Sequence, residues 1–200
     1  MTTTHRTRTA KADKDATKLL RKDHDTVRKL LGQLEATTSR GAKKRAALLL
    51  EIALEVEVHA AIEEEVFYPA FRERSETNED EKLFLEAAEE HKLVHGALPE
   101  LQSTDPRTGL FSARAKVLKD LIEHHAEEEE AELFPRAREL FSKAELQELG
   151  GRLEERKTEL IERYSSGEWN GRRSDRRNAS RAGQGRRPRA LAAGDPAATG

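Results

Sequence analysis

The chain has 200 residues, of which 37% are charged, 36% are hydrophobic and 4% are aromatic, and it contains no cysteine. Disulfide scaffolds, cysteine zinc sites and thiol nucleophiles are therefore excluded. The longest apolar run, residues 46–50, is far shorter than the roughly 20 residues of a membrane span, and the N-terminus has no apolar signal core. A cytoplasmic protein without membrane segments is expected. Leucine and alanine far outnumber valine and isoleucine, which favours helices over sheets.

The net charge of −2 averages two dissimilar parts of the chain. Residues 167–200 carry eight arginines against three acidic residues, a charge of +5, so residues 1–166 carry −7. After Trp169 this tail has almost no large apolar residue, which predicts a disordered basic tail over residues 167–200; residues 1–12 are expected to be a disordered N-terminus. The tail lacks interleaved aromatic residues and any recognisable reading motif, so nucleic-acid binding through it is not expected.

Four long amphipathic segments lie between these ends, and polar residues interrupt the apolar stripe of each one. In residues 13–38, His24 fills the gap between Leu20 and Val27. In residues 42–71, His59 and Glu63 lie between apolar positions of the same face. Side chains four residues apart project from adjacent turns of one helix face, so His59 and Glu63 are expected to lie side by side.

The third and fourth segments repeat this arrangement. The third is expected to begin at an Asn78/Glu81 capping pair and to carry His91 and His95 before Pro99 ends or kinks it. The fourth follows the turn-rich residues 103–109 and carries His125 and Glu129. A shorter amphipathic helix is predicted over residues 142–166, after a Ser142/Glu145 capping box. Together the segments predict an all-α, up-down-up-down four-helix bundle over residues 13–141, followed by a short fifth helix.

The two halves of the predicted bundle are similar in sequence. The offset from His24 to His91 is 67 residues, and it is 66 for three further pairs: His59 and His125, Glu63 and Glu129, Pro69 and Pro135. Two helical hairpins of one plan are expected to pack about a pseudo-twofold axis. Each hairpin then delivers one single histidine and one His-x-x-x-Glu pair to the centre.

Polar side chains inside a bundle cost several kcal/mol unless they are paired or bound to a metal. We therefore predict seven metal ligands: His24, His59, Glu63, His91, His95, His125 and Glu129. Two six-coordinate metals offer about twelve positions; five histidines, two bridging carboxylates and an oxo or hydroxo bridge leave about one position for a small ligand. The alternative is that each histidine satisfies a hydrogen bond in the core. Five histidines on the inner faces of four helices, in a duplicated register, favour the metal site.

The pattern His24, His59-x-x-x-Glu63, His91, His125-x-x-x-Glu129 resembles the haemerythrin-like, or HHE cation-binding, domain of bacteria. The resemblance covers about residues 15–140 and implies a four-helix bundle with two non-haem iron ions. The pair His91 and His95 also resembles the third-helix pair of haemerythrin proper, which implies five histidines and two bridging carboxylates. There the last carboxylate lies one residue further from its histidine, so bridging by Glu129 is carried over from the resemblance. The first hairpin has Arg28 at the position of His95.

Several residues close to the predicted ligands are expected to lie at the surface or to pack beside the site and not to bind metal. His124 is rotated about 100° from His125 around the helix, so it is expected at the surface or behind the ligands. Tyr68 and Phe134 are expected to pack beside the site. The glutamate runs 63–65 and 127–130 are interpreted as mostly solvated faces, with one member of each turned inward.

Three functions remain open at this point. The first is a di-iron protein that binds oxygen or nitric oxide. The second is an oxidoreductase that decomposes hydrogen peroxide or nitric oxide and takes any electrons it needs from an external donor or from the peroxide. The third is a metal-stabilised interaction module whose basic tail contacts nucleic acid or a partner. Zinc accepts the same ligands, but a histidine-rich pair of positions with an open site suits iron better.

Overall fold

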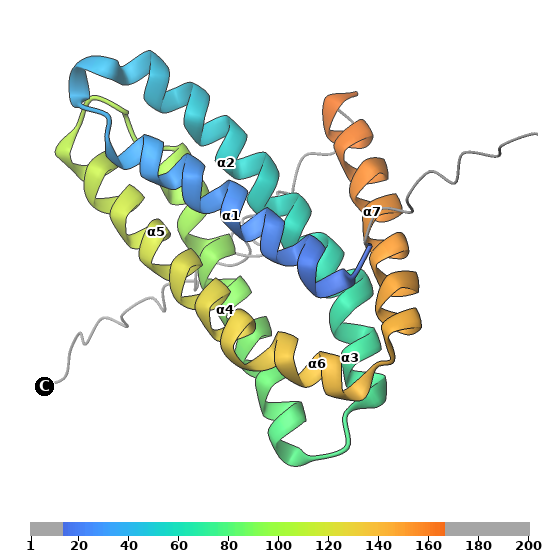
Figure 1. The fold of residues 1–200 in the computed structure, drawn as a ribbon. Coiled ribbons are helices and arrows are strands. Elements are labelled where there is room, and N and C mark those ends of the chain that lie inside the picture. Colours follow the sequence, from blue (N-terminus) through green and yellow to red (C-terminus); the bar gives the residue numbers. More distant parts are fainter. Residues whose placement is uncertain (1–13, 167–200) are drawn as a thin grey trace, which may run out of the picture.

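The computed structural model describes residues 14–166. The expectations for residues 1–12 and for the basic tail at 167–200 lie outside the described residues. Within residues 14–166 all regular structure is helical and no strand is present, so the all-α prediction is confirmed. Figure 1 shows long helical rods packed side by side in a bundle, with a further helix along one side. Over this same range, no helix is long and apolar enough to cross a membrane.

The first hairpin pairs α1, Ala16–Glu35, with α2, Ala42–Ile62. Asp15 caps α1 because its carboxylate accepts a hydrogen bond from the backbone N–H of Lys18. The chain continues from α2 through a π-helical turn, Glu63–Phe67, into α3, Tyr68–Arg74. A single rod therefore carries both members of the predicted His59 and Glu63 pair.

The second hairpin pairs α4, Asn78–Gln102, with α5, Gly109–Glu128, which continues through the π-helical turn Glu129–Leu133 into α6, Phe134–Leu140. The expected Asn78/Glu81 capping pair is wrong by one residue. Thr77 has an extended backbone and its hydroxyl accepts from the N–H of Asp80, while the Asp80 carboxylate accepts from the N–H of Thr77. The helix also runs past Pro99 to Gln102, and the carbonyl of Pro99 still accepts from the N–H of Ser103 although the proline has no N–H to donate.

Each π-helical turn ends two residues before a proline. Pro69 and Pro135 have no backbone N–H, and the ring of a proline clashes with the carbonyl four residues earlier in a regular α-helix. The wider turn lets the helix continue, with the N–H of Tyr68 donating to the carbonyl of Glu63, five residues back. The turn in the second hairpin has the same bond from Phe134 to Glu129. Each predicted carboxylate ligand therefore begins a π-helical turn, a feature that occurs frequently at functional sites.

Helix α7, Lys143–Ser165, follows the predicted Ser142/Glu145 capping box, which is present. The sequence suggested a short helix here, but α7 has 23 residues and is longer than the 20-residue α1. Its length follows from its packing, because an apolar stripe is buried against the first hairpin along the whole helix. This stripe comprises Leu146, Leu149, Leu153 and Leu160. Figure 1 shows α7 beside the N-terminal end of α1 and the C-terminal end of α2.

The interior contains two apolar clusters, one toward each end of the bundle. One includes Leu20, Ile62 and Phe134 and extends to α7. The other includes Val27, Val56 and Leu118 and lies toward the loops 36–41 and 103–108. Along α1 and α2, the predicted histidine ligands fall between residues of the first cluster and residues of the second. The polar centre is therefore enclosed by packed hydrocarbon at both ends.

Candidate metal centre

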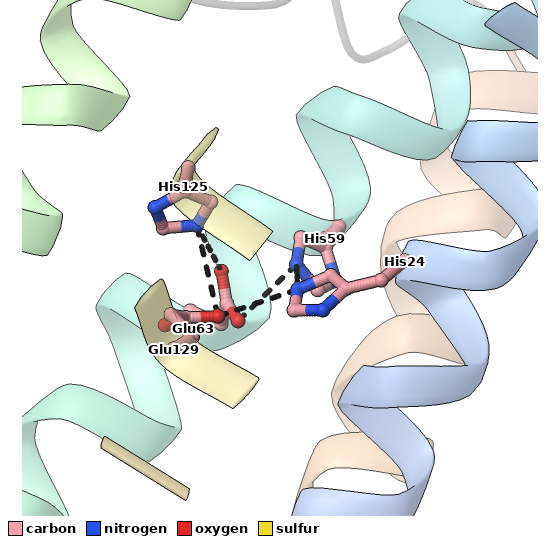
Figure 2. Close-up of side chains that lie close together, drawn as sticks. All are labelled: His24, His59, Glu63, His125 and Glu129. Atoms are coloured by element: carbon pink, nitrogen blue, oxygen red, sulfur yellow. Dashed lines mark hydrogen bonds and ion pairs between the residues drawn. The ribbon is translucent and has the colours of Figure 1, made fainter. Parts of the chain in front are cut away.

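Six of the seven predicted ligands converge in the middle of the bundle. Helix α1 supplies His24, α2 supplies His59, α4 supplies His91 and α5 supplies His125, while Glu63 and Glu129 begin the two π-helical turns. All six are buried, and Glu63 is completely inaccessible to solvent. Figure 2 shows the two carboxylates between His125 on one side and His24 with His59 on the other.

The six side chains form two halves of similar geometry. In the first half the Nε2 atoms of His24 and His59 are 3.0 Å apart, and in the second half those of His91 and His125 are 3.2 Å apart. The two oxygens of Glu63 face different halves, with Oε1 at 3.2 Å from His59 Nε2 and Oε2 at 3.3 Å from His91 Nε2. Glu129 Oε2 lies 3.3 Å from His24 Nε2 and 3.7 Å from His125 Nε2. Both carboxylates therefore contact both halves.

This arrangement fits cations. Both oxygens of Glu63 and Oε2 of Glu129 are buried and accept no hydrogen bond of normal geometry. Such unsatisfied charged oxygens are costly unless a cation compensates them. Ligand atoms about 2.1 Å from one metal ion are about 3.0–3.4 Å from each other in octahedral or tetrahedral geometry. The observed separations between Nε2 and carboxylate atoms fall in or near this range. Five of the six side chains have ligand atoms that all lie within 4.8 Å of one another: His24, His59, Glu63, His125 and Glu129.

Each of the four histidines has a carboxylate behind it, facing its Nδ1 atom. Glu130 lies 2.9 Å from His24 Nδ1, Glu64 lies 3.1 Å from His91 Nδ1 and Glu90 lies 2.9 Å from His125 Nδ1. Asp23 faces His59 Nδ1 at 3.8 Å. Such partners fix the tautomer and ring orientation of a metal-binding histidine, leaving Nε2 for the metal. We call these four residues, Asp23, Glu64, Glu90 and Glu130, the backing carboxylates.

The backing carboxylates were not predicted from the sequence. Glu64 and Glu130 belong to glutamate runs interpreted as solvated with one inward member each, but their side chains are only 22% and 16% exposed. Two members of each run therefore face the central cluster instead of one. The sequence duplication could have identified all four residues, because Asp23 and Glu90 are 67 residues apart and Glu64 and Glu130 are 66 apart, the same offsets as the predicted ligands.

The electrostatics of the site place positive charge in each half. Burial opposes protonation of His59, but the charge of Glu63 outweighs it and raises the pKa of this imidazole to about 10. In the other half, burial is likewise outweighed, and Glu129 raises the pKa of His125 well above its ordinary range. Despite complete burial, the His59 charge holds the pKa of the Glu63 carboxyl well below its usual value. Glu63 thus stays charged between the two halves, where a negative charge would also stabilise metal cations.

His95 lies apart from the other predicted ligands. Its Nε2 atom is 3.5 Å from Glu64 Oε1, and its Nδ1 atom is 3.8 Å from Glu57 Oε1. In the first hairpin the equivalent residue, Arg28, donates to Glu130 at 2.7 Å. Both residues therefore contact the carboxylate behind a histidine. His95 also lines the central cavity, so it remains a candidate for the seventh ligand.

Other residues near the centre lie where the sequence predicted, and Tyr68 makes additional contacts through its hydroxyl. The side chain of His124 is 62% exposed and contacts Glu90 and Glu128 at the surface. Phe134 stacks on the ring of His24, with centroids 5.7 Å apart. Tyr68 packs beside the site and in addition donates a hydrogen bond of 2.8 Å to Glu129 Oε1, with its hydroxyl 3.3 Å from His91 Nε2. The Tyr68 oxygen is therefore close enough to the centre to influence a bound metal.

A helical bundle with a buried, pseudo-twofold cluster of histidines and glutamates belongs to the class of metal-binding four-helix proteins. The family model of the hemerythrin HHE cation binding domain matches residues 15–137, and the chain belongs to this family. A crystal structure of a hemerythrin HHE cation binding domain-containing protein from Mycobacterium kansasii is similar, with a TM-score of 0.67 and 26% identity, over 79% of this chain and 94% of that one. The family and the bundle predicted from the sequence are confirmed.

Similar sequences are found in mycobacteria and in a cyanobacterium. Uncharacterised proteins of Mycobacterium tuberculosis and Mycobacterium bovis are 29% identical over 140 residues, which is 70% of this chain and 83% of theirs. A protein from a Nostoc strain named as a DNA nickase is 26% identical over 153 residues, 76% of this chain but 42% of that protein. The family match ends at residue 137 and therefore does not include α7.

Proposed function

We propose that this protein holds two iron ions in the central cluster and binds, or reacts with, a small oxidant such as oxygen, nitric oxide or hydrogen peroxide. The observation that carries the proposal is Glu63, a completely buried carboxylate whose two oxygens lack hydrogen bonds and face a histidine pair each. His24, His59, His91 and His125 are the proposed nitrogen ligands, Glu63 and Glu129 the proposed bridging carboxylates, and His95 a seventh candidate. A nitrogen-rich ligand set favours iron over the oxygen-liking magnesium and calcium ions.

The cavity beside the cluster supports a small ligand. Its volume is about 30 Å³, and its walls combine the histidines with apolar side chains, among them Val27, Val56, Val94 and Ile122. This space accommodates about two water-sized molecules and therefore suits a small oxidant. Bound iron would supply the affinity for the oxidant and the redox chemistry. The apolar side chains of the cavity limit access of water, while the backing carboxylates orient the imidazoles.

The metal assignment is tested by iron analysis with an optical spectrum. Protein expressed in iron-replete medium is expected to contain about two irons per chain and to show absorption bands that change on addition of azide. Glu63→Gln should lose both irons, because one side chain contacts both halves. Glu65→Gln is the matched control, since Glu65 is an exposed member of the same π-helical turn and pairs with Arg156. Zinc alone in the wild-type protein would contradict the proposal.

The reaction with oxidant is tested on the same samples. Hydrogen peroxide added in excess should give sustained oxygen evolution if the centre is catalytic, and a change of the spectrum without turnover if it only binds. The Glu63→Gln variant should show neither response, while Glu65→Gln should behave as the wild type. A spectrum of the iron-loaded protein that is insensitive to peroxide, oxygen and nitric oxide would refute the proposed reactivity while leaving the metal assignment intact.

A further inference from the structure

Helix α7 lies outside the residues that match the family, yet one of its side chains, Lys157, contacts a backing carboxylate of the candidate metal centre. The ammonium of Lys157 donates to Asp23 Oδ1 at 2.7 Å and lies 3.6 Å from Glu55 Oε2. The Asp23 side chain is only 8% exposed, so this ion pair is well shielded from solvent. A shielded pair with a short hydrogen bond restrains a carboxylate far more than an exposed pair does.

Asp23 is the backing carboxylate of His59. Its other oxygen, Oδ2, is buried and faces His59 Nδ1 at 3.8 Å, and both atoms lack a normal hydrogen bond. Each is therefore the available partner of the other. Since Lys157 holds Oδ1, the carboxylate stays in place with Oδ2 directed at the imidazole.

The other half of the centre is arranged differently. Glu90, the equivalent of Asp23, lies behind His125 at 2.9 Å, and its second oxygen faces the exposed His124 at 3.4 Å. No part of α7 is needed there. Lys157 of α7 pairs with Asp23, whereas the backing carboxylate Glu130 is held by Arg28 of α1. The two halves thus have the same types of proposed ligand, but different residues hold their backing carboxylates.

We propose that Lys157 is a positioning residue for the metal position between His24 and His59. It holds Asp23 in place as the acceptor for His59 Nδ1, and this fixes the tautomer in which Nε2 faces the metal. The inference rests on the proposed function, because it concerns how strongly that centre holds one of its two metals. Loss of such a supporting partner typically weakens metal binding by about 10–100-fold. One metal of the two should therefore depend on α7, and the other should not.

The test compares Lys157→Met with Arg156→Met and Lys157→Arg. Arg156 is the neighbouring residue on α7, also cationic, and it pairs with Glu65 and Glu159. Each full-length protein is loaded with iron(II) without oxygen and titrated with a chromogenic chelator. We expect Lys157→Met to release about one iron per chain at a roughly 10–100-fold lower chelator concentration, with the second iron held as in the wild type. Arg156→Met should match the wild type, and Lys157→Arg should recover most of the lost affinity.

A variant on the Asp23→Asn background separates positioning from general damage to α7. If Lys157 acts through Asp23, adding Lys157→Met to Asp23→Asn should change the release of iron little. Simultaneous loss of both irons in Lys157→Met, or a release curve equal to that of Arg156→Met, would overturn the inference while leaving the di-iron proposal standing. A wild-type protein that fails to bind two irons would refute the proposed function itself, and the inference with it.

Discussion

Tyr68 and Phe134 are equivalent residues of the two hairpins, and their difference makes the centre asymmetric. The hydroxyl of Tyr68 contacts both Glu129 and His91, whereas Phe134 has no hydroxyl and stacks on His24. Burial, together with the charges of Glu129 and Glu63, raises the pKa of the Tyr68 phenol well above its ordinary value. The hydroxyl therefore stays protonated around neutral pH and remains a hydrogen-bond donor.

Replacing Tyr68 with phenylalanine should show what this donor contributes. In Tyr68→Phe the Oε1 atom of Glu129 loses its hydrogen bond while it stays buried, so we expect the metal-free protein to lose about 1–3 kcal/mol of unfolding free energy. The azide-sensitive spectrum of the iron-loaded protein should also shift, because Glu129 is a proposed ligand. Urea denaturation and absorption spectroscopy measure the two effects. An unchanged unfolding free energy together with an unchanged spectrum would contradict a role beyond packing.

Asp80 is a residue whose charge should make stability depend on acid pH. Its carboxylate accepts hydrogen bonds from Arg136 Nε at 2.6 Å and from the N–H groups of Glu76 and Thr77, which connects the start of α4 with α6. The Arg136 hydrogen bond, opposed by burial, holds the pKa of this carboxyl well below its ordinary value. A lowered native pKa stabilises the fold above the unfolded pKa of about 3.9, and this stabilisation is lost as the pH falls toward the native value.

The variant Asp80→Asn removes this dependence. The unfolding free energy of the metal-free wild type should fall more between pH 5 and pH 3 than that of Asp80→Asn, as measured by denaturant titration at both pH values. Other carboxylates contribute equally in both proteins, so the difference isolates Asp80. Asp120→Asn, which alters an exposed pair with Lys116, serves as the control and should resemble the wild type. Parallel losses in Asp80→Asn and wild type would refute the assignment.

At the scale of elements, the position of α7 depends on a close approach at Gly150. A Cβ atom added there would lie 1.7 Å from the carbonyl oxygen of Lys14 and 3.0 Å from the backbone nitrogen of Ala16. Both neighbours are backbone atoms at the start of α1, so they cannot move aside as a flexible side chain does. The absence of a side chain at this position therefore lets α7 pack directly on α1.

The adjacent glycines of α7 offer a matched pair of substitutions. Gly150→Ala should destabilise the protein by about 1–3 kcal/mol, because α7 or the start of α1 must shift. Gly151 has no atom within 4 Å of an added Cβ, so Gly151→Ala should stabilise the helix by about 0.5–1 kcal/mol through backbone entropy. Thermal unfolding of both variants gives opposite signs if the packing is as described. A stabilising Gly150→Ala would contradict the close contact.

The elements also show which features the sequence could predict. Apolar periodicity with capping residues predicted each rod and the start of α7, because these signals are local to one helix. The π-helical turns were not predicted, although Pro69 and Pro135 recur at the offset of the glutamates. Proline indicates that a helix ends or bends, and the packing of the whole rod decides that it continues through a wider turn.

For the molecule as a whole, the duplication predicted the topology and the convergence of six side chains, because a repeated spacing brings repeated residues to one axis. It did not predict the direction of His95, since rotation about side-chain bonds turns this ring toward Glu57 and Glu64. The contact between Lys157 and Asp23 could not be predicted from the sequence either. It depends on how α7 packs against α1, which is a relation between distant segments that periodicity within one helix does not encode.

The position of the centre between two apolar clusters has a consequence for metal removal. Each cluster consists of side chains from several helices and includes no proposed ligand, so we expect both clusters to form independently of the metal. The metal-free protein should therefore keep its helices. This differs from small zinc domains, in which the metal is needed for folding.

Metal should nevertheless stabilise the folded chain strongly, because the unfolded chain has no assembled site. At a free metal concentration of 100 times Kd, one site contributes about 2.7 kcal/mol, so two sites contribute about 5 kcal/mol. For a chain of this size this corresponds to a rise in Tm of about 10–20 °C. Circular dichroism melts of chelator-treated and reloaded protein measure the rise, and Glu63→Gln should show almost none. Loss of helical signal on metal removal would contradict the independence of the two apolar clusters, and equal Tm values with and without metal would contradict binding at the centre.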